Sequence, residues 1–154
     1  MVKFLHYIDI KFFSKENKHN RDCENSEYIN QLKLKMKKII GDIPEIKNIL
    51  IENFEPFGDF ENKLLITKVR IEKSIKVTLK EMRDLIISNK DWIKETIDDD
   101  CFAYLRLDKK EFFEKGIKKR VDHGDCIHIK LKIAAYPAKK SEAIKKFEEL
   151  IMSI

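Results

Sequence analysis

Basic and aromatic side chains recur at every second position in two segments of the sequence. Lys130 and Lys132 alternate with isoleucine and leucine, and Tyr104 and Arg106 alternate with alanine and leucine. Because a strand points successive side chains to opposite faces, each pair shares one face and the apolar residues share the other. Cations neutralise phosphates and tyrosine rings stack on unpaired bases, so this pattern indicates an RNA-binding sheet face. The alternative is an ordinary solvated strand face, where such residues are common.

A second basic region runs from residue 106 to residue 120. It holds seven basic and three acidic residues, a net charge of +4, around a short helix that Asp108 would cap and Gly116 would end. The alternative is a solvated helix face. Tyr7, Lys11 and Tyr136 are expected to extend the sheet face. The predicted RNA-binding residues are Tyr104, Arg106, Lys109, Lys118, Lys119, Arg120, Lys130 and Lys132.

Other reactive residues are sparse. His123, Cys126 and His128 could contribute to a zinc site, but no second ligand pair follows at a recognisable spacing. The run 98–100 of three aspartates could hold a divalent cation, although such a run is more often a solvated turn. None of the four glycines forms a phosphate-binding loop. We therefore expect no enzyme activity, no metal and no cofactor, and a metal-dependent hydrolase is the third hypothesis.

Composition limits the class of protein. Apolar residues make up 43 % and charged residues 38 % of the 154, enough for the core of a single domain spanning residues 1–154. The net charge of +5 weakly favours an anionic partner, or reflects ordinary solubility. Three cysteines make no disulfide framework, which indicates a reducing compartment. With no secretory leader pattern and no long apolar run, we expect a cytoplasmic protein without membrane contact.

Hydrophobic spacing predicts an α+β fold in the order β-α-β-β-α-(α)-β-α-β-α, with a mixed or antiparallel sheet and helices packed on one face. The expected strands are 2–13, 49–54, 64–71, 101–107 and 126–136, and the expected helices include 26–40, one after residue 78, one after residue 90, 108–116 and one near the end. The lysines of 33–38, on the polar face of the first helix, either join the binding surface or only solvate the helix.

Several local details follow from the same patterns. His6 is expected on the apolar face of the first strand, as a core histidine, with Leu5 on the opposite face. Thr78 to Glu81 has the sequence of a capping box, with Val77 placed for a hydrophobic staple. Trp92 is expected to anchor a helix. In the last strand, Cys126 and Tyr136 are expected on the face that carries the lysines.

The order of several motifs resembles a known family. The segment 104–109 (Tyr-Leu-Arg-Leu-Asp-Lys), Gly116, Asp122 and Asp125, and the segment 129–138 are similar to the archaeal RNA-binding family catalogued as predicted exosome subunits. The resemblance spans nearly the whole chain and is strongest after residue 101. The segment 110–113 departs from it, since a glutamine and small residues are expected there.

This resemblance implies a fold similar to the large-subunit ribosomal protein that binds 5S ribosomal RNA. It also implies RNA binding and contact with RNA-processing proteins such as the exosome, and it offers no catalytic residues. We therefore predict a non-catalytic RNA-binding protein, monomer or homodimer. The alternative is a protein-interaction or homodimerisation module that meets its partner through the same sheet face.

Overall fold

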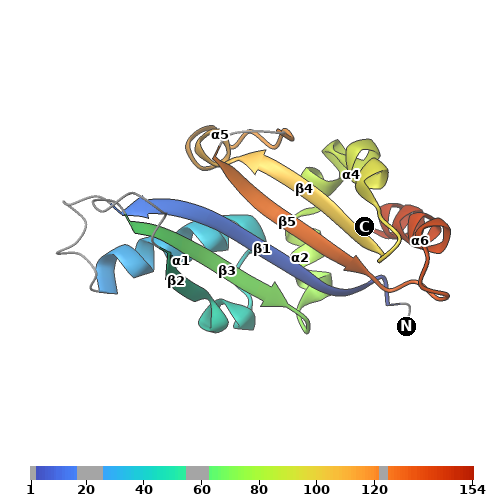
Figure 1. Cartoon of the computed structure of the whole chain (residues 1–154), viewed down its shortest axis with the longest axis horizontal. Helices are drawn as coiled ribbons and strands as arrows, with labels where there is room; N and C mark the ends of the chain where they lie inside the picture. Colours follow the sequence, from blue (N-terminus) through green and yellow to red (C-terminus); the bar gives the residue numbers. More distant parts are fainter. Residues whose placement is uncertain (1–2, 17–25, 55–62, 122–124) are drawn as a thin grey trace.

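The computed structural model describes residues 3–16, 26–54, 63–121 and 125–154. Its centre is a five-stranded sheet in the order β2-β3-β1-β5-β4, with every neighbouring pair antiparallel. Figure 1 looks onto this sheet, with β1 crossing the middle and β4 at one edge. The strands are β1 (Leu5–Glu16), β2 (Leu50–Phe54), β3 (Lys63–Ile71), β4 (Phe102–Asp108) and β5 (Cys126–Ile133).

The helices gather behind the sheet in the view of Figure 1, so one sheet face is covered and the other is open. They are α1 (Ser26–Ile40), the 3₁₀ turn η2 (Pro44–Asn48), α2 (Ile75–Glu81), α3 (Arg83–Ser88), α4 (Lys90–Thr96), α5 (Lys109–Lys115) and α6 (Lys140–Ser153). The expected element order and the α+β class are confirmed, and the sheet is antiparallel. None of the helices in the described residues is long and apolar enough to cross a membrane.

The core lies between the sheet and these helices. β5 contributes Ile127, Ile129, Leu131 and Ile133, and β4 contributes Ala103, Leu105 and Leu107, all buried. α1 supplies Leu32, Met36, Ile39 and Ile40, while α6 supplies Ala143, Phe147 and Leu150. The strand alternation thus places the polar residues of β4 and β5 on the open face, as the sequence predicts.

The start of β1 differs from the prediction. The pairing of β1 with β5 shifts register between Leu5 and Tyr7, which is the signature of a bulge. An extra residue reverses the alternation before it, so Leu5 is buried in the core, while Tyr7 lies on the open face. The prediction of a core His6 is wrong, because the bulge leaves His6 exposed.

The predicted capping box at Thr78 is also wrong. Helix α2 begins three residues earlier, at Ile75, and Thr78 lies inside it with its hydroxyl donating to the carbonyl oxygen of Ser74 at 2.8 Å. Glu45 of η2 receives hydrogen bonds from the hydroxyl and backbone N–H of Ser74, which fixes the true helix start. Val77 is 57 % exposed and therefore forms no staple.

The last strand ends earlier than expected. β5 stops at Ile133, so Tyr136 lies three residues beyond it and is 95 % exposed instead of belonging to the strand's lysine face. At the other end, Cys126 has the same strand parity as His128 and Lys130, as predicted, and its side chain is buried without belonging to the core. It pairs with Asp108 where β4 turns into α5, and the backbone of the neighbouring Asp125 accepts a hydrogen bond from the Lys109 amide.

Candidate nucleic-acid interface

The open face is the side of the sheet opposite the helices, and strand register sets its side chains in rows. One row across β1, β5 and β4 consists of Tyr7, Lys132 and Phe102. Two residues further along the strands, Asp9, Lys130 and Tyr104 form the next row, and Arg70 of β3 continues it. Neighbouring strands lie about 4.8 Å apart, so the members of a row are in reach of one another.

The rings of Tyr7, Phe102 and Tyr104 form an aromatic cluster at one end of the open face. The ring centroid of Phe102 lies 6.4 Å from that of Tyr7 and 6.3 Å from that of Tyr104, with tilted planes. The Tyr104 hydroxyl donates to an Asp98 carboxylate oxygen at 3.2 Å, and burial, followed by the charge of Asp98, raises the pKa of this phenol. The tyrosine therefore stays neutral, with its ring held in place.

Cations surround these rings. The ammonium groups of Lys130 and Lys132 lie 4.0 Å and 4.3 Å from the centroid of Phe102, and the guanidinium of Arg70 lies 4.0 Å from the centroid of Tyr7. Such cation–π contacts are worth about 0.5–1 kcal/mol at exposed sites. They hold positive charge directly beside surfaces on which a base could stack.

A basic row lies further along the same face and consists of Lys68, Lys11, His128 and Arg106. The register pairs Lys68 with Lys11, Lys11 with His128, and His128 with Arg106, so these four residues run across β3, β1, β5 and β4. Lys68 also pairs with Glu52 of β2 at 3.0 Å, and His128 contacts the Phe13 ring edge-on at 5.9 Å. Four cationic or protonatable groups in a row attract a phosphate chain.

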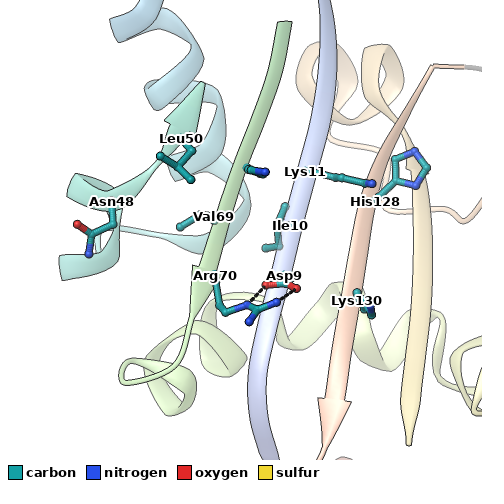
Figure 2. Close-up of a pocket in the computed structure, with 10 residues that line it drawn as sticks. Asp9, Ile10, Lys11, Asn48, Leu50, Val69, Arg70, His128 and Lys130 are labelled. Atoms are coloured by element: carbon teal, nitrogen blue, oxygen red, sulfur yellow. Dashed lines mark hydrogen bonds and ion pairs between the residues drawn. The ribbon is translucent and has the colours of Figure 1, made fainter. Parts of the chain in front are cut away.

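A hollow of about 500 Å³ opens over β1 and β3, between the row that contains Asp9 and Lys130 and the basic row. Figure 2 shows Lys11, His128 and Lys130 around it, with Leu50 and Asn48 on the side of β2. Asp9 and Arg70 form a bidentate ion pair within it, at 2.8 Å and 2.9 Å. Arg70 thereby balances the negative charge of the Asp9 carboxylate, and this ion pair raises the pKa of Arg70.

His128 responds to its neighbours in the basic row. Burial lowers its pKa below the ordinary 6.5, and the positive charges of Arg106 and Lys11 lower it further. At neutral pH the imidazole is therefore uncharged in the protein alone. An anion bound beside it would offset the two cations and favour its protonation.

The structure brings together four of the predicted RNA-binding residues, Tyr104, Arg106, Lys130 and Lys132, on the open face. Lys109 lies at the start of α5, where its ammonium pairs with Asp125 at 2.9 Å and donates to the carbonyl oxygen of Phe13. Its side chain is only 15 % exposed. Lys109 therefore links Asp125, just before β5, to β1 and offers little surface to a phosphate.

The predicted residues 118–120 lie at the edge of the sheet, beside the helices. Lys118 approaches Asp84 of α3 at 3.9 Å, and the guanidinium of Arg120 lies 3.1 Å from the ring centroid of Trp92 in α4. Asn89 holds this segment, because its side chain donates to the Lys118 carbonyl at 2.9 Å and accepts from the Arg120 amide at 3.2 Å. Lys119 is exposed. The second basic region is thus divided between the open face and the helix layer.

Sequence reasoning missed Phe102, Lys68 and Arg70. Phe102 has the same strand parity as Tyr104 and Arg106, so the alternation that placed those two also placed this ring on the open face. Lys68 and Arg70 alternate with the buried Thr67, Val69 and Ile71. The alternation of side chains was visible in both β3 and β4. An apolar ring in β4, and polar residues in a strand as mixed as β3, were not recognised as parts of a binding face.

Carboxylates and histidines do not converge on this surface. Within the described ranges, no group of three or more His, Cys, Asp and Glu side chains is placed to hold a metal ion, and His123 lies outside those ranges. In the aspartate run, Asp98 accepts hydrogen bonds from the backbone amides of Asp100 and Phe102 at 3.1 Å and 3.0 Å. These contacts order the turn that leads into β4.

Known proteins are similar to this chain in sequence and in fold. The RNA-binding protein PAB1135 of Pyrococcus abyssi is 31 % identical over 112 residues, which cover 67 % of this chain and 71 % of that protein. In fold, the chain is similar to the DUF54 protein Mth689 of Methanothermobacter thermautotrophicus, with a TM-score of 0.69, 20 % identity and 97 % and 99 % of the two chains covered.

The protein SSO0741 of Sulfolobus solfataricus gives a TM-score of 0.62 at 20 % identity, with 96 % and 98 % of the two chains covered. At these identities the two solved structures establish the fold alone. The family model described as RNA binding matches residues 20–133, which include β2, β3, β4 and β5 and hence most of the open face. The chain belongs to this RNA-binding family.

Proposed function

We propose that this protein binds RNA through the open face of its sheet and catalyses no reaction. The observation that carries the proposal is the joint presence of the aromatic cluster and the basic row on one uncovered surface. The family description and the name of the Pyrococcus relative support it. In this role the basic row and Lys130 contact phosphates, which positions the RNA without reading its sequence.

The test is a titration with RNA at two salt concentrations, using the Lys130→Ala, Lys132→Ala double variant. Each lost phosphate contact should make the dependence of log K on log salt shallower by about 0.7–0.9. A Lys80→Ala, Lys140→Ala double variant removes the same charge from the exposed surfaces of α2 and α6 and serves as the control. Unchanged affinity and slope in the open-face variant would refute the assignment.

A role beside RNA-processing proteins such as the exosome belongs to the same proposal and rests on the sequence resemblance. It predicts that the protein co-elutes with a purified archaeal exosome core when RNA is present. Elution at separate volumes, with and without RNA, would remove this part of the proposal and leave RNA binding untouched.

The alternative function is a protein-interaction or homodimerisation module. The specific observation in its favour is that aromatic side chains lie on an uncovered sheet face, as they do at protein interfaces. A mass measurement in solution separates the two. A dimer that the Tyr104→Ala variant converts to a monomer, together with no affinity for RNA at low salt, would establish the alternative.

A further inference from the structure

We infer that the RNA bound by the open face is unpaired, with bases stacked on the aromatic cluster and the backbone continuing toward the basic row. This inference rests on the proposed function and names its substrate class. It starts from a feature that phosphate binding alone does not explain, namely three rings gathered at one end of a solvent-facing surface.

Phe102 is the centre of that cluster. It lies on β4, the last strand in the sheet order, so no further strand follows on its outer side. Its neighbours at alternate positions, Ala103 and Leu105, enter the core on the other face, so the Phe102 ring does not contribute to that core. Phenylalanine has no polar group to hydrate, and an aromatic ring on a wet face is a surface for stacking.

The two lysines over Phe102 differ in how firmly they are held. Lys132 also donates a hydrogen bond to the carbonyl oxygen of Asp100 at 2.6 Å, whereas Lys130 lies over the ring without such a bond to the residues that the structure describes. A charge-assisted bond to a phosphate is stronger than an exposed cation–π contact. An arriving phosphate therefore draws the Lys130 ammonium off the ring, while Lys132 stays in place. This frees part of the ring for a base, so the phosphate contact and the stacking contact form together.

The spacing of the two regions suits a single strand. Arg106 lies four positions after Phe102 on β4, and Lys11 lies four positions after Tyr7 on β1, which corresponds to about 13 Å along the strands. The hollow and Lys130 lie between them. A chain of a few nucleotides can cover this distance with a base on the cluster at one end and phosphates on the basic row at the other.

A duplex cannot use the same surface in full. In an A-form helix the bases are stacked inside, the major groove is deep and narrow, and a flat protein face meets the backbone and the shallow minor groove. The basic row would still attract it, but the three rings would find no base to stack on. The geometry therefore favours the single strand by the contribution of the aromatic cluster.

The experiment compares a short single-stranded RNA of mixed sequence with the duplex made by annealing its complement. The variants are Phe102→Leu, which keeps apolar bulk without a ring, and Tyr136→Leu, a matched control that removes an exposed ring beyond the end of β5. We expect the wild type to prefer the single strand. We expect Phe102→Leu to weaken binding of the single strand about fivefold or more and to leave duplex binding unchanged.

Tyr136→Leu should change neither affinity. If Phe102→Leu lowers the thermal midpoint, Tyr7→Leu replaces it, with the same expectation. An equal effect of the variant on both RNAs, or no effect on either, would overturn the inference while RNA binding stands. A wild type that binds neither RNA at low salt would refute the proposed function itself.

Discussion

Removing two members of the basic row should change how RNA affinity responds to salt. The perturbation is the double variant Lys11→Ala, Arg106→Ala. Both residues are exposed on the open face, and they flank His128 in the register of β1, β5 and β4. Neither belongs to the buried core, so the variant should fold as the wild type does.

The size of the effect follows from counterion release. If each residue neutralises one phosphate of a single strand, the slope of log K against log salt becomes shallower by about 1.4 for the pair. A tenfold rise in salt would then weaken the variant's binding about 25-fold less than it weakens wild-type binding. Affinity at low salt should fall as well, because the electrostatic contribution is largest there.

A second prediction for the same variant concerns the protein in the absence of RNA. The charges of Arg106 and Lys11 both lower the pKa of His128, after the larger effect of burial. Removing them should raise the pKa of His128 in an NMR titration, although burial keeps it below that of an exposed histidine. This measurement shows whether the basic row is as close as the register places it.

The control is Lys90→Ala, Lys145→Ala, which also lowers the net charge from +5 to +3 but changes exposed lysines of α4 and α6. Its salt slope should match that of the wild type. If both double variants shift the slope equally, the RNA responds to overall charge and not to the open face. An unmoved His128 pKa in the Lys11→Ala, Arg106→Ala variant would refute the geometry of the row.

The remaining predictions concern pH and stability. The pKa of His128 is lowered in the folded protein, and a bound phosphate would raise it, so RNA binding should take up a proton. RNA affinity should therefore rise as the pH falls through the pKa of His128 in the complex. The His128→Asn variant should not show this rise. The sign for folding is opposite: the unfolded chain binds the proton more readily, so this histidine lowers stability as pH falls below about 6.5, which pH-dependent urea unfolding would detect. Asn89→Ala should lower the free energy of unfolding by about 1–3 kcal/mol, because the buried Asn89 side chain bonds the carbonyls of Leu85 and Lys118 and the amide of Arg120. The RNA affinity of this variant should stay within about twofold of the wild-type value, since the 118–120 segment lies beside the helix layer. A larger loss of affinity would indicate that this segment belongs to the binding surface.

The covered and open faces of β4 and β5 could be predicted from the sequence, because alternation between apolar and polar residues is a direct consequence of strand geometry. The end of α1 at Gly41 and the cap of α5 at Asp108 were also predictable. Gly41 has φ +79°, which glycine adopts without strain, and Asp108 accepts the Glu111 amide at 2.8 Å. Each of these signals involves residues close together in the chain.

The errors arose where contacts between distant segments decided the outcome. The bulge at Leu5 depends on how β1 pairs with β5, and the start of α2 depends on Glu45, 29 residues before Ser74. Neither dependence is visible in a local pattern. Prediction from local patterns therefore misplaced His6 and the first turn of α2, although it correctly expected strand β1 and helix α2.

The candidate site was predictable to the extent that strand parity defines it. Parity brought Tyr104, Arg106, Lys130 and Lys132 together, and the same rule would have added Phe102. Closeness in sequence was a poor guide to closeness in function. Lys109 and the 118–120 segment are near Arg106 in the chain, yet their side chains turn to Asp125, Asp84 and Trp92.

The most direct test of the central claim is an NMR titration of the isotope-labelled protein with a short single-stranded RNA. We expect the shift changes to concentrate on the open-face residues of β1, β4 and β5, including Phe102, Lys130 and His128, while α1, α2 and α6 stay unchanged. Shift changes confined to the helix layer, or none at low salt, would contradict RNA binding by the open face of the sheet.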